Sequence, residues 1–280
     1  MAGYPRPELI ATTEWLAANL GGQDVRLIDV RWRPDGSGRT TYTTGHIAGA
    51  AYLDWLEQLV DRDPESGVLQ LAGPDRVAAA LEAAGVGNGS TVVLYDDVGG
   101  LYAARTWWSL RAYGLDSVRI LDGGLRAWTE GGGALSTEVL TPPVATFQPS
   151  LKPGVRLTTA EVQDLIRSSG VLFVDARATA EYHGFEGNTR RLGHIPGAVN
   201  LPVASLTEPG TGRFQSSERL HDLLLKANVV RGRRIVCYDG SGVAAAKLAF
   251  LLTVAGYDDV AVYDGGWAEW GDRLDLPVDR

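Results

Sequence analysis

The feature that most constrains how this chain can fold is an internal duplication. Four segments of the first half recur in the second half, in the same order and roughly 145 residues later. Such a repeat indicates two copies of one folding unit joined in tandem. The matching pairs are 28–31 with 173–177, 44–50 with 192–198, 93–97 with 236–240, and 118–125 with 260–267.

Each copy alternates short apolar strands with amphipathic helices, a pattern typical of an α/β fold in which helices cover both faces of a parallel sheet. In such a sheet the ligand lies beyond the carboxyl ends of the strands. In the first copy we expect helices at 12–20, 75–84, 102–113 and 125–130, and strands at 25–30, 91–95 and 118–121.

A proline-rich stretch separates the two copies. Pro142, Pro143 and Pro153 lie between them, and prolines grouped in this way are typical of a linker. We therefore expect an N-terminal domain at 1–140, a linker at 141–154 and a C-terminal domain at 155–280.

The composition narrows the classes of partner. A formal net charge of -8 argues against binding to nucleic acid or to an anionic membrane surface. No stretch reaches the length of a transmembrane helix, and the first residues lack the basic and apolar regions of a signal sequence. The single cysteine, Cys237, excludes an internal disulfide and a cysteine metal cluster. We expect a cytoplasmic protein that binds a small molecule and needs no cofactor, and the sequence leaves a protein partner unknown.

The segment 235–248 carries most of the functional information. It reads as a short apolar strand, a tight glycine loop and the start of an alanine-rich helix. Such a loop aims successive backbone N–H groups, and the positive end of the helix, at one point where a negative charge is stabilised. Asp239 opens this loop and is the candidate catalytic residue. The loop residues expected to contact a ligand are Gly240, Ser241, Gly242, Val243 and Ala244.

Together these segments resemble the two-domain rhodaneses, the thiosulfate and 3-mercaptopyruvate sulfurtransferases. The resemblance rests on the paired Asp-x-Arg, Gly-His-Ile-x-Gly-Ala and Tyr-Asp-Gly segments and on the glycine loop, and it covers nearly the whole chain. It implies a catalytically silent first domain with Asp96 in its own loop. It also implies a second-domain loop resembling Cys-Gly-Ser-Gly-Val-Thr, whose cysteine takes up sulfane sulfur as a persulfide.

The chain departs from the pattern of these rhodaneses at the centre of the loop. Aligned on Gly-Ser-Gly-Val, Asp239 occupies the position of the nucleophilic cysteine and Ala244 that of the closing threonine. The resemblance places Glu181 at a position where mammalian-type enzymes have an arginine that contacts the anionic substrate. Arg191, in contrast, resembles the arginine that binds the substrate carboxylate in the mercaptopyruvate group. The additional departures at Ala244 and Glu181 favour natural divergence over a single engineered substitution.

The role of Asp239 has two interpretations. A carboxylate cannot carry sulfane sulfur, because persulfide formation needs a polarisable thiolate. We expect the loop N–H groups to lower the pKa of Asp239, which would then serve as a base or an electrostatic anchor. Alternatively, Asp239 only satisfies its own loop, as we assume for Asp96. Cys237 is the possible alternative nucleophile, but it lies within an apolar strand, where a cysteine is usually buried and inert.

Further candidates for the binding site come from neighbouring loops and from aromatic positions that wall the interdomain pocket in the family. Each has an alternative role in packing or on the exposed surface. The duplicated histidines, His46 and His194, and the duplicated Asp-x-Arg pairs are expected to be structural instead. The binding candidates are Glu181, Tyr182, His183, Arg190, Arg191, Trp32, Tyr102 and Trp267.

Three functions stay open. The first is an enzyme that has left persulfide chemistry and acts on a small carboxylate-bearing substrate, because Asp239 and Glu181 beside Arg191 favour a ligand with a carboxylate at one end and a cationic or hydrogen-donating group at the other. Such a site should reject thiosulfate, a dianion that would face Asp239. The second is a sulfurtransferase that uses Cys237. The third is a binding or regulatory protein without chemistry.

Overall fold

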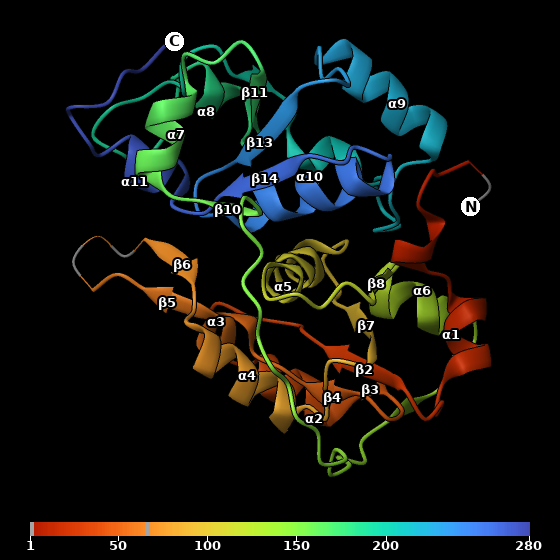
Figure 1. Ribbon diagram of the computed structural model, residues 1–280. Coiled ribbons are helices and arrows are strands. Elements are labelled where there is room, and N and C mark those ends of the chain that lie inside the picture. The colour runs from red at the N-terminus through yellow and green to blue at the C-terminus, as the bar shows by residue number, and fades with distance from the viewer. Residues whose placement is uncertain (1–2, 65, 67) are drawn as a thin grey trace.

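Two five-stranded sheets organise the molecule, one in each half of the chain (Figure 1). The computed structural model describes residues 3–64, 66 and 68–280. The first half contains η1 (Pro7–Leu9), β1 (Ile10–Ala11), α1 (Thr13–Asn19), β2 (Val25–Asp29), α2 (Gly38–Thr44), β3 (His46–Ile47), β4 (Ala51–Tyr52), α3 (Trp55–Leu59), β5 (Val60–Arg62), β6 (Leu69–Leu71), α4 (Pro74–Ala83), β7 (Thr91–Tyr95), α5 (Leu101–Ala112), β8 (Val118–Leu121), α6 (Gly124–Glu130) and β9 (Leu135–Ser136).

The second half repeats the same succession of elements in shorter form. It contains β10 (Arg156–Leu157), α7 (Thr159–Leu165), β11 (Val171–Asp175), α8 (Thr179–Tyr182), β12 (Val199–Asn200), η2 (Val203–Leu206), α9 (Ser217–Lys226), β13 (Arg234–Tyr238), α10 (Val243–Val254), β14 (Val260–Tyr263) and α11 (Gly266–Trp270).

The two sheets have the same strand order. The first runs β1-β8-β7-β2-β4 and the second β10-β14-β13-β11-β12, and every pairing within them is parallel. The strands correspond one to one, so the duplication in the sequence is also a duplication of structure. The prediction of two tandem α/β domains, each a parallel sheet flanked by helices, is confirmed.

Several helices and strands begin, end or are buried as their local sequence predicts. The Thr12 side chain accepts a hydrogen bond from the Trp15 backbone N–H at 3.0 Å and caps α1. β7 spans the predicted residues, and α5 begins one residue earlier than expected. All five positions of β11 are buried, because a parallel strand is covered on both faces.

The duplicated polar residues have structural roles in both domains. In Asp29–Arg31 and in Asp175–Arg177 the arginine Nη2 lies 2.6 Å from the aspartate Oδ2, and both pairs are buried. His46 and His194 are buried, and the Nδ1 of each lies within 2.9 Å of a backbone carbonyl oxygen. The predicted structural role of these residues is confirmed.

Helices α5 and α10 lie between the two sheets and pack against each other (Figure 1). The Trp107 ring meets the Phe250 ring edge-on across this interface, with 5.0 Å between centroids. One buried apolar cluster continues from the first domain into the second, and each domain has a second cluster of its own. The interface therefore belongs to the core, which holds the N-terminus of α10 against the first domain.

No helix or strand is present between β9 and β10, in residues 137–155, all of which the structure describes. This segment passes from one domain to the other as an extended trace (Figure 1). The boundaries at 140 and 155 stay predictions.

Candidate functional site

The loop between β13 and α10 forms the candidate site. β13 ends at Tyr238, and α10 begins at Val243 after Gly242, whose φ of 80° lies in the left-handed region that favours glycine. This turn points backbone N–H groups back at the Asp239 carboxylate. The Gly242 N–H donates to Asp239 Oδ1 at 2.6 Å and the Ala244 N–H donates to Oδ2 at 3.2 Å.

Burial is the largest influence on the pKa of Asp239. The residue is 6% exposed, and desolvation raises the pKa of its carboxyl above the usual aspartate value. The N–H groups of the loop and of the first helical turn lower this pKa, but by less than burial raises it. The sequence-based prediction of a lowered pKa is therefore wrong, because the loop lies in an apolar domain interface rather than at an open helix end.

Asp96 occupies the corresponding place in the first domain but has different contacts. Its Oδ1 accepts from the N–H groups of Val98 and Gly100 at 3.0 and 2.8 Å, and its Oδ2 from those of Tyr102 and Ala103 at 2.9 and 3.0 Å. A carboxylate offers roughly four lone-pair sites, two on each oxygen. The loop of the first domain thus fills the acceptor capacity of Asp96.

At hydrogen-bond distance Asp239 accepts two such bonds, one on each oxygen, and the backbone N–H groups of Ser241 and Ala245 also act on its carboxylate. Its close contacts with loop amides are therefore fewer than the four of Asp96. The hydroxyl of the neighbouring Ser241 also makes no hydrogen bond to any described residue and is partly exposed.

A cavity of about 750 Å³ opens between the domains beside Asp239. Its walls come from the Asp239 loop and η2 on one side and from the first domain on the other. Of the residues singled out from the sequence, the structure brings Asp239, Ser241, Val243, Ala244, Trp32 and Tyr102 together here. The remaining lining residues are Pro34, Trp55, Leu56, Arg62, Leu69, Leu101 and Val203.

The first domain supports the Asp239 loop through a buried arginine. Arg105 of α5 is 1% exposed, and its Nη1 lies 2.8 Å from Asp264 Oδ1 and donates to the Gly242 carbonyl oxygen at 3.3 Å. Asp264 Oδ2 also accepts from the Leu71 backbone N–H at 2.5 Å and lies 3.0 Å from Arg156 Nε. A buried cross-domain ion pair thus fixes the N-terminus of α10.

Each half of this architecture matches one family model. The model of the rhodanese-like domain matches residues 12–131 and again residues 158–273. The chain belongs to the rhodanese family. Its membership, inferred above from a resemblance, is thereby confirmed.

Rhodanese-family proteins similar to this chain over nearly its whole length include sulfurtransferases. The putative thiosulfate sulfurtransferase SseB of Mycobacterium tuberculosis is 35% identical over 98% of each chain. The sulfur carrier protein TtuD of Thermus thermophilus is 32% identical over 99% of this chain and 98% of its own. The 3-mercaptopyruvate sulfurtransferase of Escherichia coli is 31% identical over 95% of this chain and 96% of its own.

Solved structures of other proteins have the same fold. The crystal structure of SseA from Escherichia coli, described as a 3-mercaptopyruvate sulfotransferase, superposes with a TM-score of 0.83 at 28% identity and covers 92% of this chain and 98% of its own. The wild-type structure of EanB gives a TM-score of 0.85 over 97% of this chain and 69% of its own, at 24% identity, a likeness of fold alone.

Two arginines predicted to border the rhodanese pocket do not line the Asp239 cavity. The Arg191 guanidinium donates to the Trp270 carbonyl oxygen at 3.0 Å and also to those of Arg273 and Leu276. These carbonyls near the end of the chain need donors, and Arg191 supplies them. Arg190 is exposed.

The three candidates around α8 also lie away from the cavity. Glu181 accepts from the backbone N–H at the N-cap of α8 at 3.3 Å. The Tyr182 ring stacks on the His194 ring with 3.8 Å between centroids. His183 is exposed. These contacts are those of helix capping and packing.

Trp267 and Cys237 are both enclosed in the second domain. The Trp267 indole Nε1 donates to Thr189 Oγ1 at 2.9 Å, and the Arg177 guanidinium lies 4.5 Å from the ring centroid. Cys237 has no exposed surface within β13, and burial raises the pKa of its thiol far above the usual value. A thiolate, the reactive form, is disfavoured there.

Sequence reasoning missed four residues of this region. Arg62 and Trp55 reach the cavity from a hairpin and a short helix that carry no motif, so no local signal could have found them. Arg105 and Lys247 had a signal, because each is a charged residue within an otherwise apolar stretch of helix. Both are buried, with exposures of 1% and 3%.

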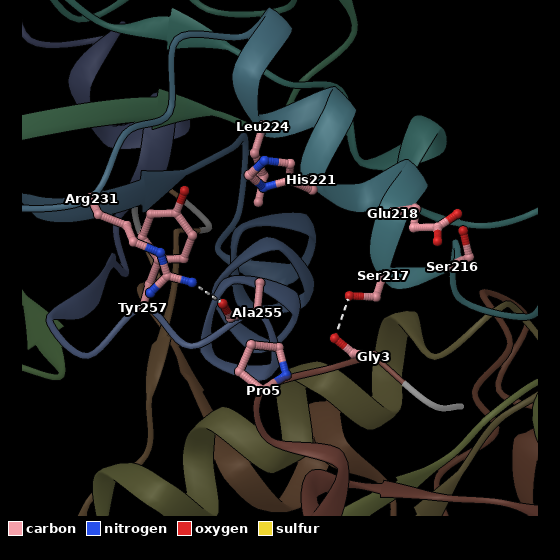
Figure 2. Close-up of a pocket in the computed structure, with 10 residues that line it drawn as sticks. All are labelled: Gly3, Pro5, Ser216, Ser217, Glu218, His221, Leu224, Arg231, Ala255 and Tyr257. Atoms are coloured by element: carbon pink, nitrogen blue, oxygen red, sulfur yellow. Dashed lines mark hydrogen bonds between the residues drawn. The ribbon is translucent and has the colours of Figure 1, made fainter.

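A second cavity, of about 500 Å³, lies between the N-terminal segment and α9 (Figure 2). Two of its polar side chains are used within the protein. The Ser217 hydroxyl donates to the Gly3 carbonyl oxygen at 2.7 Å, and the Arg231 guanidinium donates to the Ala255 carbonyl oxygen at 2.5 Å and lies 4.8 Å from the Tyr257 ring centroid. This cavity offers no carboxylate with the buried loop geometry of Asp239.

Within the described residues, no three or more His, Cys, Asp or Glu side chains gather as metal ligands. In the same part of the chain, none of the helices has the length and apolar character needed to cross a bilayer.

Proposed function

We propose that this rhodanese-family protein is an enzyme that acts on a small carboxylate-bearing molecule through Asp239, as a base or an electrostatic anchor, without a persulfide on the loop. The observation that carries the proposal is the contrast between the two loop aspartates. Asp96 has all its acceptor sites filled, whereas Asp239 lines the interdomain cavity with two bonds.

The raised pKa of Asp239 favours a chemical role over binding alone. A carboxylate whose pKa is raised by burial holds a proton more tightly, and so it is a better general base than an exposed aspartate. The same burial gives its charge a strong interaction with a ligand, because water screens it poorly.

Donors in the same cavity support a carboxylate on the substrate. Arg62 lines the cavity, and the Trp55 indole Nε1 has no hydrogen-bond partner among the described residues. These two donors take the place of Arg191 in the original inference, which rested on Asp239 and Glu181 beside Arg191, and Asp239 is the acid of that set that lines the cavity. A ligand that joins an anionic end to a cationic or hydrogen-donating end could contact both these donors and Asp239.

Sulfur transfer from thiosulfate is disfavoured at this site. A negative charge 4 Å from Asp239 is repelled by about 1 kcal/mol in water and by several-fold more in a drier cavity. The only thiol of the chain, Cys237, is enclosed in the core. Both circumstances oppose a persulfide intermediate.

The test is a thiosulfate–cyanide assay on the wild type, Asp239→Cys and Cys237→Ala, with mass spectrometry of the intact protein. We expect no thiocyanate from the wild type or from Cys237→Ala. In Asp239→Cys the new thiolate can attack the outer sulfur of thiosulfate and release sulfite, so a sulfur adduct on residue 239 is expected. Rapid turnover by the wild type, with an adduct on Cys237, would refute the proposal.

A further inference from the structure

Three aromatic rings of the first domain form one corner of the Asp239 cavity. Trp32 meets Trp55 and Tyr102 at steep angles of 63° and 72°, with centroid distances of 6.0 and 5.6 Å. Trp55 and Tyr102 stack at 16° and 5.4 Å. All three line the same cavity as Asp239. Trp55 is 3% exposed and stacks on Tyr102, whereas Trp32 and Tyr102 are partly exposed, so these two rings present aromatic surface to the cavity.

The Asp239 carboxylate has no basic side chain paired with it among the described residues. No lysine, arginine or histidine among the described residues lies within 4.0 Å of its carboxylate oxygens. Arg33, the cation next to the aromatic corner in the chain, is paired with Asp97. Lys247 faces Asp96 of the other loop, and Arg62 is exposed to solvent.

We propose that this corner binds an alkylated ammonium group, with its methyl groups against the rings and its charge beside Asp239. The ring faces of tryptophan and tyrosine attract cations, and quaternary ammonium groups are recognised in this way. A primary ammonium is strongly hydrated and would lose more on entering an apolar corner. The inference rests on the proposed assignment of Asp239 to a ligand, and it adds the chemical class of the group that Asp239 meets.

The test compares three probes on the wild-type protein by isothermal titration calorimetry. Choline carries the alkylated cation, 3,3-dimethylbutan-1-ol has the same shape without charge, and ethanolamine has the charge without the methyl groups. We expect choline to bind at least about tenfold more tightly than either of the others, a difference of about 1.4 kcal/mol. Equal binding of choline and the uncharged alcohol, tighter binding of ethanolamine, or no binding of choline would overturn the inference.

Variants then assign the binding to the corner. Asp239→Asn and Trp32→Leu should each weaken choline binding about tenfold, whereas Trp32→Phe, which keeps a ring face, should lose less. Trp15→Leu is the matched control, because Trp15 lies in α1 and packs against Arg119. Unchanged affinity in both Asp239→Asn and Trp32→Leu would place choline elsewhere.

The sulfur-transfer assay keeps this inference separable from the proposed function. A wild type that makes no thiocyanate but binds the three probes equally contradicts the ammonium site alone. A wild type that transfers sulfur through Cys237 contradicts the proposed function, whatever the probes do.

Discussion

Replacing Lys247 with methionine is expected to stabilise the protein at neutral pH. Lys247 lies five residues after the N-cap of α10, as Arg105 does after that of α5, but only Arg105 has an ion-pair partner within 4.0 Å among the described residues. Burial lowers the pKa of Lys247 from 10.5 to about 8, and the nearby Asp96 charge opposes this lowering. At pH 7 the folded state therefore still holds the charged amine, but at a free-energy cost that the unfolded chain does not have.

The magnitude follows from the displacement of this pKa. At about 1.4 kcal/mol for each pH unit, a change from 10.5 to about 8 costs the folded state at most roughly 3 kcal/mol when the amine is protonated in both states. Methionine fills a similar volume without charge, but it also removes the cation that faces Asp96. We expect a net gain of about 1–2 kcal/mol in the free energy of unfolding at pH 7.

The sign of the pH dependence provides a second check. Between about pH 8 and 10.5 the folded protein has lost the Lys247 proton while the unfolded chain still holds it, so wild-type stability rises with pH. The advantage of Lys247→Met should therefore be full below pH 8 and shrink above it. Urea unfolding at pH 7 and pH 9.5, followed by fluorescence and circular dichroism together, measures both effects.

The matched control is Lys226→Met on α9, where the lysine is exposed and a change within about 0.5 kcal/mol is expected. Two results would refute the reasoning. One is a Lys247→Met protein that is less stable than the wild type at pH 7. The other is a difference between them that does not change between pH 7 and pH 9.5.

Three further predictions concern the support of the loop and the thiol. Arg105→Met should lower the free energy of unfolding by about 2 kcal/mol in a urea titration, because it removes one of the two arginines paired with the buried Asp264 carboxylate, which keeps Arg156 and the Leu71 N–H; a loss below about 1 kcal/mol would contradict this. Gly242→Ala should lower the free energy of unfolding by more than about 1 kcal/mol, because φ at Gly242 is 80° and the new Cβ would lie 2.7 Å from the Arg105 guanidinium. The control Gly240→Ala, whose new Cβ has no atom within 4 Å, should leave the free energy of unfolding nearly unchanged in the same assay. Cys237 should react with an aromatic disulfide reagent only at the rate of unfolding, and fast labelling of the native protein would show that the thiol is accessible.

The fold could be predicted from the sequence because its signals are local and occur twice. Period and composition identified the strands at 91–95 and 118–121 at their observed bounds. The short helix Gly38–Thr44 was not among the expected helices, since its threonines and glycine are weak helix formers. Packing in the folded domain overrides that local preference.

The candidate site could be predicted only in part, because it is built by two domains. The Asp239 loop carries a motif, and Trp32 and Tyr102 were identified through the family resemblance. Arg62 comes from a hairpin with no motif, and its contact with the cavity depends on domain packing. Arg191, which the resemblance implied as a ligand contact, instead donates to backbone carbonyl oxygens and does not line the Asp239 cavity.

The difference between the two loop aspartates follows from loop length. Four residues, 97–100, separate Asp96 from the first residue of α5, and three, 240–242, separate Asp239 from that of α10. The longer loop lets amides before the helix and in its first turn reach both oxygens of Asp96, so its carboxylate is fully used. The shorter loop brings one amide to hydrogen-bond distance of each oxygen of Asp239, and this carboxylate lines the cavity. The difference of one loop residue thus accompanies the different contacts of the two carboxylates, and the proposed ligand role of Asp239 depends on that difference.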